Sequence, residues 1–305
     1  MPHRCRVKRS PTILQMLRER HGLADPQPSA PDNLRMPNLR LLLAYDGTDF
    51  TGWQIQENRR TVQGVLEAAI QDLTGLAPRL LCAGRTDSGV HALGQVASLE
   101  TRSTIPADKW RSALRVRLPE DLIVREVTEV PPRFHATYSP ISKRYRYLIH
   151  NSLVEDMFLR RYSWKVRPPL DVEAMQLAAS RLLGTHDFRS FESNWPNNKT
   201  TSVRTVHDLQ VFRTSHGPMM QGFSCHTEES GPQDFIAIEI EADGFLYNMV
   251  RIIAGTLVDV GKGTRTPEDV ERILIAQNRQ LAGDTSPAHG LFLVQVYYPK
   301  NDDEL

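Results

Sequence analysis

Residues 82–91 read Cys-Ala-Gly-Arg-Thr-Asp-Ser-Gly-Val-His and place a carboxylate, a guanidinium and an imidazole close together. Asp87 lies between Gly84 and Gly89, a setting typical of a tight turn, because glycine supplies positive φ and aspartate hydrogen-bonds its own backbone. In a strand-like segment, however, Arg85 and Asp87 project to the same face. An ion pair between them would favour the ionised carboxylate. The stretch therefore indicates either a polar turn or an aspartate presented as a nucleophile or base.

Three other kinds of site fit these residues less well. Asp-Ser-Gly resembles the signature of aspartic proteases, but those enzymes need two carboxylates that share a proton, and only Asp46-Gly47 and Asp243-Gly244 offer a partner. His91 has no second His or Cys at ligand spacing, so a metal site is not indicated. No GxGxxG follows a strand and no Walker lysine loop is present. We therefore expect neither a metal nor a nucleotide cofactor.

The composition is that of a globular protein without a membrane span. The 305 residues are 40% hydrophobic, and no apolar run approaches the roughly 20 residues needed to cross a bilayer. Cys5, Cys82 and Cys225 form no CxxC pair and leave an odd thiol, which favours the reducing cytoplasm. The net charge of +1 restricts any nucleic-acid surface to local patches. Two stretches of alternating basic and aromatic residues, 143–147 and 160–165, are candidates.

Hydrophobic periodicity predicts a mixture of strands and helices. Residues 39–45 form an apolar strand candidate, and apolar residues at helical spacing follow from Val62, with Thr61 as N-cap and Gly75 as the stop. Further strands are predicted at 79–83, 94–100, 122–130, 142–150, 203–213, 235–241 and 291–297, and further helices at 108–118, 172–183, 245–260 and 267–276. Because the elements do not alternate strictly, we expect an antiparallel-rich α+β fold with helices on one face.

Two segments of the chain resemble each other faintly. Residues 41–47 form a strand that ends in Asp-Gly and leads through aromatic residues to a helix, and residues 235–244 do the same. This echo indicates either two related halves around a shared cleft or two unrelated strands that end in common turn residues.

We predict three segments along the chain. Residues 1–37 are rich in Arg and Pro and read as a weakly structured extension, with Met36 as a candidate true start. Residues 38–150 form an N-terminal half that carries the Asp87 loop, and residues 151–305 form a C-terminal half that completes the cleft. Residues 224–233 read as an acidic insertion between two strands.

A longer pattern connects these features. Residues 83–96 closely resemble the catalytic motif of the TruA-type tRNA pseudouridine synthases. The match continues in chain order through 45–54, 62–63, 134–136, 143–147, 187–191, 245–251 and 290–293. It covers essentially residues 39–298, although Ser88 stands where alanine is common in the family.

The resemblance implies a pseudouridine synthase fold of two related mixed-sheet halves, with helices packed on the outer faces and a central active-site cleft. It implies a cofactor-free homodimer that isomerises uridine to pseudouridine at positions 38 to 40 of the tRNA anticodon stem-loop. By motif position, Asp87 is the catalytic aspartate and Arg85 its charge partner and a base-displacing side chain. Tyr145 is the aromatic residue on the target uracil, and Arg251 is a second basic partner. A catalytically silent tRNA-binding protein of the same fold is the alternative.

The residues alone leave two of these roles open. Tyr145 and Tyr147 alternate along one strand, so either or both also fit simple packing. Arg251 precedes an apolar run, where an arginine usually keeps its charged end at the surface. Their roles depend on how the fold places them.

Overall fold

The computed structural model describes residues 36–193, 201–215 and 234–300. The extension predicted for residues 1–37 lies almost wholly outside the described residues, and the insertion predicted at 224–233 lies wholly outside them. Pro37–Leu305 forms one compact unit. Its predicted division into halves at residue 150 stays a prediction.

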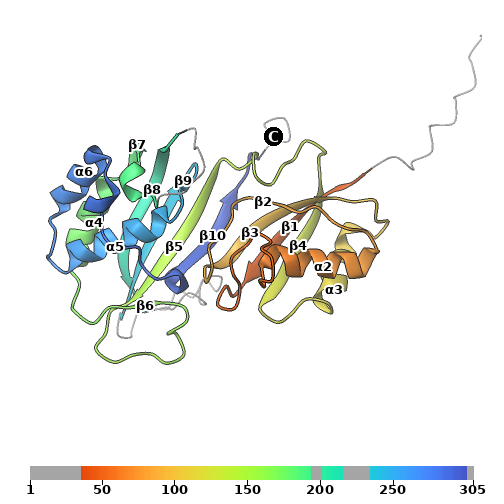
Figure 1. The fold of residues 1–305 in the computed structure, drawn as a ribbon, viewed down its shortest axis with the longest axis horizontal. Helices are drawn as coiled ribbons and strands as arrows, with labels where there is room; N and C mark the ends of the chain where they lie inside the picture. The colour runs from red at the N-terminus through yellow and green to blue at the C-terminus, as the bar shows by residue number, and fades with distance from the viewer. Residues whose placement is uncertain (1–35, 194–200, 216–233, 301–305) are drawn as a thin grey trace, which may run out of the picture. The chain divides into compact units, whose positions relative to one another are not determined.

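A ten-stranded sheet runs through this unit (Figure 1). Its main path has the order β4-β1-β3-β10-β5-β9-β8-β7, while β2 pairs with β3 and β6 pairs with β5. The strands are β1 (Asn38–Tyr45), β2 (Leu81–Cys82), β3 (His91–Glu100), β4 (Leu122–Val130), β5 (Ser142–His150), β6 (Trp164–Lys165), β7 (Gly184–Asp187), β8 (Val203–Thr214), β9 (Phe235–Ala242) and β10 (Leu291–Tyr297). Neighbours on the main path are antiparallel except β3 and β10, which pair in parallel. The last strand of the chain therefore joins two antiparallel groups, and the predicted α+β class is confirmed.

Helices pack against both groups of strands. They are α2 (Val62–Thr74), α3 (Ala107–Arg115), α4 (Val172–Ser180), α5 (Met249–Gly261) and α6 (Pro267–Ala276). Helix α3 contacts β4, α4 contacts β8, and α5 and α6 pack on α4. Apolar side chains of strands and helices are buried in one main cluster, which includes Leu41, Leu66 and Leu257. None of the helices in the described ranges is long and apolar enough to span a membrane.

Helix α2 shows how local sequence sets an element. The Thr61 side chain accepts a hydrogen bond from the backbone N–H of Gly64 at 3.3 Å, which satisfies a free donor at the first turn. Gly75 ends the helix with a left-handed φ of 72°, which glycine adopts without a steric penalty. The predicted helix and both of its caps are confirmed.

Helix α5 begins four residues later than predicted. Asn248 has a φ of 61°, in the left-handed region, so the chain from Phe245 to Asn248 forms a loop and the helix begins at Met249. The apolar periodicity of residues 245–260 did not show this break, because a single left-handed residue leaves the pattern of apolar residues unchanged. This loop is part of the candidate site.

Candidate active site

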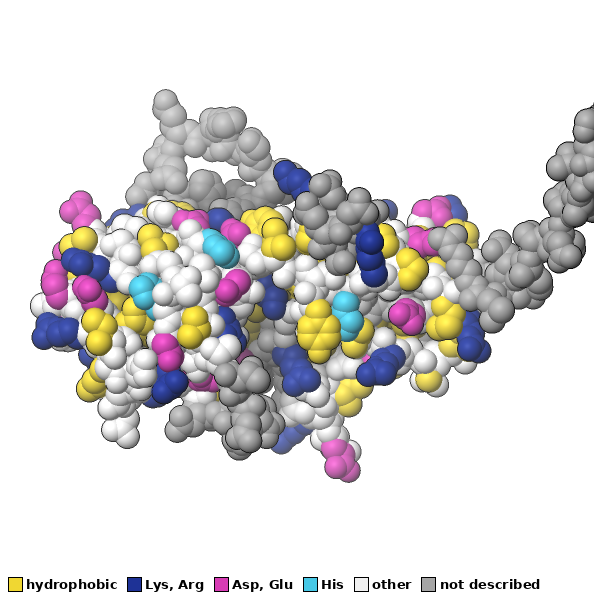
Figure 2. All heavy atoms as spheres, turned by 90° about the horizontal axis from the view of Figure 1, so that it is seen from above, with side chains coloured by type: hydrophobic (Ala, Val, Ile, Leu, Met, Phe, Trp, Pro, Cys, Tyr) yellow, Lys and Arg dark blue, Asp and Glu magenta, His cyan; other side chains and the backbone are white. Residues whose placement is uncertain are grey.

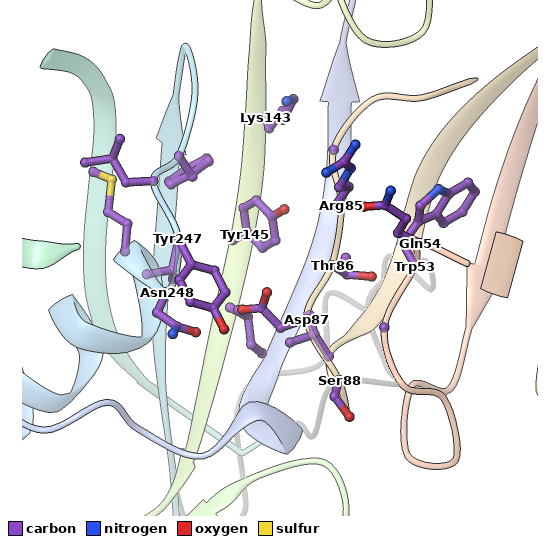
Figure 3. Close-up of a pocket in the computed structure, with 18 of the residues that line it drawn as sticks. Trp53, Gln54, Arg85, Thr86, Asp87, Ser88, Lys143, Tyr145, Tyr247 and Asn248 are labelled. Atoms are coloured by element: carbon purple, nitrogen blue, oxygen red, sulfur yellow. The ribbon is translucent and has the colours of Figure 1, made fainter. Parts of the chain in front are cut away.

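A cavity of about 890 Å³ lies between the two antiparallel groups of strands (Figure 3). Its lining comes from residues 51–54 after β1, the turn at 83–88, two side chains of β5, and residues 245–250 before and at the start of α5. A volume of this size is typical of pockets that enclose a small molecule or a nucleotide.

The two segments that resemble each other in sequence lie around this cavity. Strand β1 leads through Asp46-Gly47 and the lining loop at 51–54 to α2, and β9 leads through Asp243-Gly244 and the lining loop at 245–248 to α5. Both segments are therefore strand, turn, loop and helix, and both contribute walls to one shared cavity.

Asp87 lies in a tight turn, as the simpler interpretation predicted. The N–H of Val90 donates to the carbonyl of Asp87 at 3.1 Å, and Gly89 has a φ of 77°. The same turn presents the Asp87 carboxylate to the cavity, toward the side on which Tyr145, Tyr247 and Asn248 lie (Figure 3). The turn and the presentation of the carboxylate are thus two properties of one structure.

The turn is fixed from the β1 side by close backbone contact. The N–H of Trp53 donates to the carbonyl of Thr86 at 3.0 Å. Gly52 has a φ of 82°, and a Cβ atom at this position would lie 2.7 Å from the Thr86 carbonyl oxygen. Only glycine allows this approach without displacing the residue before Asp87.

A buried hydrogen-bond network from β1 and β3 supports the turn. The Tyr45 hydroxyl lies 2.7 Å from Thr86 Oγ1, and the Gln95 amide donates to the carbonyl of Gly84 at 2.8 Å. The Gln95 amide also lies within hydrogen-bonding distance of the Tyr45 hydroxyl, at 3.4 Å. Burial raises the pKa of Tyr45 well above its ordinary value, so its hydroxyl stays protonated. Sequence reasoning missed Tyr45 and Gln95 as supports of the turn, although both belong to the segments matched by the family resemblance.

Arg251 is the cationic partner of Asp87. Its Nη1 atom lies 3.8 Å from Asp87 Oδ2, although the two residues are far apart in sequence. Arg251 is held in place because Nε donates to the carbonyl of Ser286 at 2.7 Å and Nη1 donates to Asn248 Oδ1 at 2.9 Å. Its side chain is 17% exposed, so it is not the surface arginine that its position in an apolar run also allowed. Arg251 lies beside Asp87 but is not among the residues that line the cavity.

The environment of Asp87 acts on its ionisation in two opposite ways. Burial raises the pKa of Asp87 above its ordinary value, and the positive charge of Arg251 lowers it again without fully compensating. The result is a partly dehydrated carboxylate with the Arg251 guanidinium beside it. A partly desolvated carboxylate of this kind is suited to nucleophilic or basic chemistry.

The predicted pairing of Arg85 with Asp87 is wrong. Arg85 is exposed, it makes no ion pair with Asp87 among the described residues, and its side chain points away from Asp87 along the cavity wall (Figure 3). The prediction assumed strand geometry, in which alternate residues share a face, but residues 84–88 form an irregular turn. Arg85 does line the cavity, so its predicted contact with substrate stays a prediction.

The structure separates the two tyrosines of β5. Tyr145 lines the cavity and packs edge-on against Phe245, with ring centroids 4.9 Å apart. Tyr147 lies in the core, where its hydroxyl donates to the carbonyl of Pro287 at 2.8 Å. Tyr145 is therefore placed to meet a ligand, whereas Tyr147 supports packing.

The basic stretch 143–147 is not a phosphate-binding patch as a whole. Arg144 forms ion pairs with Glu241 at 2.8 Å and Asp208 at 3.1 Å, and Arg146 pairs with Glu239. These two arginines are occupied by carboxylates on the neighbouring strands, which corrects the earlier interpretation. On the face that Figure 2 shows, Lys and Arg side chains are interspersed with Asp and Glu side chains, in line with the small net charge.

Comparisons with known proteins agree with this geometry. The family model described as "tRNA pseudouridine synthase" matches residues 42–139 and 178–299. The chain is 46% identical over 263 residues to the tRNA pseudouridine synthase A of Acetivibrio thermocellus, which covers 86% of this chain and 100% of that relative. It is 47% identical over 265 residues to the protein of the same name from Brevibacillus brevis, with the same coverage of both chains. The matched segments contain Asp87 and Arg251, and the chain belongs to the tRNA pseudouridine synthase family.

Proposed function

We propose that this protein converts uridine to pseudouridine at positions 38 to 40 of the tRNA anticodon stem-loop, with Asp87 as the catalytic group. Family membership supports the isomerisation of uridine in tRNA. The observation that carries the role of Asp87 is its place in the cavity, half-buried, with Arg251 at 3.8 Å and with Tyr145 lining the same cavity. These three residues supply a carboxylate, its counter-ion and an aromatic surface.

The reaction demands these groups. The bond between C1′ of the ribose and N1 of uracil must break, the base must turn, and C5 must bond to C1′. An ionised carboxylate assists this exchange by attack on the base, by attack on the sugar, or by removal of a sugar proton. Each route needs Asp87 deprotonated beside the bound nucleotide, which is the state that Arg251 favours.

The target base must also leave its stack in the RNA, which requires a few kcal/mol. Stacking on an aromatic side chain stabilises the displaced base by about 1–3 kcal/mol, which offsets part of this cost. Tyr145 is the candidate, because it lines the cavity and Phe245 holds its ring from one edge. Arg85 lines the cavity without an ion-pair partner among the described residues, and we assign it to the space that the displaced base vacates.

We further propose that the protein acts in the cytoplasm as a homodimer. The segment between β5 and β6 exposes four large apolar side chains, Leu153, Val154, Met157 and Phe158, each at least 64% exposed. Exposed apolar groups of this kind are what a subunit interface covers. Light scattering tests the assembly, and a monomer at working concentrations would contradict it.

The activity is tested by tritium release from tRNA labelled at C5 of uridine, combined with carbodiimide mapping of the modified positions. We expect product at positions 38 to 40 with the wild type and none with Asp87→Asn. Asp108→Asn is the matched control, because Asp108 is 67% exposed on α3, away from the cavity lining, and should leave the activity unchanged. Equal activity of wild type and folded Asp87→Asn would refute the role of Asp87. RNA binding without pseudouridine from the wild type would establish the catalytically silent alternative.

A further inference from the structure

Three cationic side chains line the cavity itself, whereas Arg251 lies beside Asp87 outside the lining. They are Arg85 from the turn, Lys143 from β5 and Arg204 from β8. None of them forms an ion pair with a carboxylate among the described residues, in contrast to Arg144 and Arg251, which are paired. A cavity wall therefore carries three positive charges that the described part of the protein does not neutralise.

Lys143 is the most constrained of the three. Strand β5, in which it lies, is paired on both sides, with β10 and with β9. Lys143 shares a strand face with Tyr145, two residues on, at a rise of about 7 Å. Its Nζ atom lies over the backbone of the Asp87 turn, where a Cβ atom on Gly84 would be 3.3 Å away. Burial lowers the pKa of Lys143, the neighbouring thiol of Cys82 opposes this, and the charge of Arg204 adds to it.

The two arginines lie close to this lysine. The positive charge of Arg204 lowers the pKa of Lys143, and the positive charges of Lys143 and Arg85 both lower the pKa of the Cys82 thiol. Arg204 is oriented by its own backbone, since Nη1 donates to the carbonyls of Thr201 and Val203. The three cations therefore form one cluster on the wall of the cavity.

We propose that Lys143, together with Arg204, forms a phosphate-binding subsite that holds the RNA backbone next to the target nucleotide, while Arg85 keeps the role proposed above. The proposal rests on the proposed function for its ligand, an RNA strand in the cavity. A phosphate supplies the negative charge that the cluster lacks, and charge-assisted hydrogen bonds to phosphate are strong. With the base on Tyr145, a backbone phosphate reaches Lys143 two residues along the same strand. Asp87 repels phosphate at its own end of the cavity, so the two ends fix the direction of the nucleotide.

The first test is the salt dependence of RNA binding. The dissociation constant of an anticodon stem-loop RNA is measured against KCl concentration for wild type, Lys143→Met and Lys109→Met. Each lost phosphate contact lowers the magnitude of the slope of log Kd against log KCl concentration by about 0.7–0.9. For Lys143→Met we therefore expect a slope that is lower in magnitude by about 1. Lys109 is the matched control, because it is 68% exposed on α3 and pairs with Asp108, and its slope should equal that of wild type. An unchanged slope for folded Lys143→Met would overturn the subsite.

The second test locates the phosphate. Single methylphosphonates replace the phosphates on either side of the target uridine, one at a time. Wild type should lose affinity several-fold at one position, and Lys143→Met should lose no more at that position, because the contact is already gone. Equal additional losses at every position would overturn the proposal, and Arg204→Gln provides the same test if Lys143→Met does not fold. Both measurements are of binding, so a wild type that binds RNA but forms no pseudouridine contradicts the proposed function and leaves the subsite to be judged by its own result.

Discussion

Replacement of Arg251 by glutamine removes the cation that opposes the effect of burial on Asp87. At 3.8 Å, two unit charges attract by about 4 kcal/mol at an effective dielectric constant of about 20. Asp87 is 31% exposed, so solvent screening reduces this value. An opposite charge at such a distance lowers the pKa of an aspartate by about 1–3 units. We therefore expect the pKa of Asp87 to rise further in Arg251→Gln, on top of the rise that burial already produces.

The assay is the rate of pseudouridine formation under single-turnover conditions, from about pH 5 to about pH 8. Because Asp87 acts when ionised, the rate falls as pH decreases through the pKa of Asp87, and in Arg251→Gln this fall should begin at a higher pH than in wild type. Arg117→Gln is the matched control, because it removes a surface partner of Asp72 outside the cavity and should keep the wild-type profile. Urea denaturation shows whether the variant is folded. Superimposable acidic limbs for folded Arg251→Gln and wild type would refute the electrostatic role of Arg251.

Three further predictions concern Asp87 and its turn. Burial raises the pKa of Asp87 in the folded state, so the protonated carboxyl stabilises the fold below its ordinary pKa of about 4, and this stability is lost as pH rises through the folded pKa. Urea unfolding at several pH values should therefore show that the stability advantage of wild type over Asp87→Asn shrinks as pH rises. A constant difference in stability would contradict this. Tyr45→Phe removes the hydroxyl that lies 2.7 Å from Thr86 Oγ1, so we expect a loss of about 1–3 kcal/mol in the free energy of unfolding. We also expect a lower kcat with little change in KM. A kcat equal to that of wild type would show that the hydroxyl does not position the turn. Gly52→Ala places a Cβ 2.7 Å from the Thr86 carbonyl at a φ of 82°, and thermal unfolding should show a loss of about 1 kcal/mol or more, whereas unchanged stability would mean that the loop moves freely away.

The sequence predicted elements well where the signal is local. The predicted bounds of β4, β5, β10 and α6 match the structure residue for residue, because alternation, capping residues and terminal turns are all contained within each segment. Helix α2 and both of its caps were predicted for the same reason.

The motif predicted which residues belong to the candidate site, but it did not predict how they contact one another. Asp87 and Tyr145 line the cavity, and Arg251, which the resemblance implied as a second basic partner, pairs with Asp87, whereas Arg85, two residues from Asp87, does not. Pairing by alternation fails in a turn, and the true partner is brought in by tertiary packing from α5. The support of the turn by Gln95 depends on the register of β1 against β3, in which Leu43 lies opposite Gln95. The register depends on how two segments that are distant in sequence pair with each other, and the pattern within either segment alone does not reveal it.

The position of the last strand explains how the two sides of the site come together. Asp87 precedes β3, and Arg251 belongs to α5 on the far side of the sheet's parallel junction. Strand β10 pairs with β3 on one side and with β5 on the other, through residues that include Phe292 opposite His91. The carbonyl that holds Arg251 belongs to Ser286, in the segment that leads directly into β10. The same closing segment therefore sets both the junction between the strand groups and the orientation of the arginine. Because the Ser286 carbonyl and Asn248 Oδ1 together orient Arg251, the closing segment helps to supply the counter-charge that lowers the pKa of Asp87 against the effect of burial.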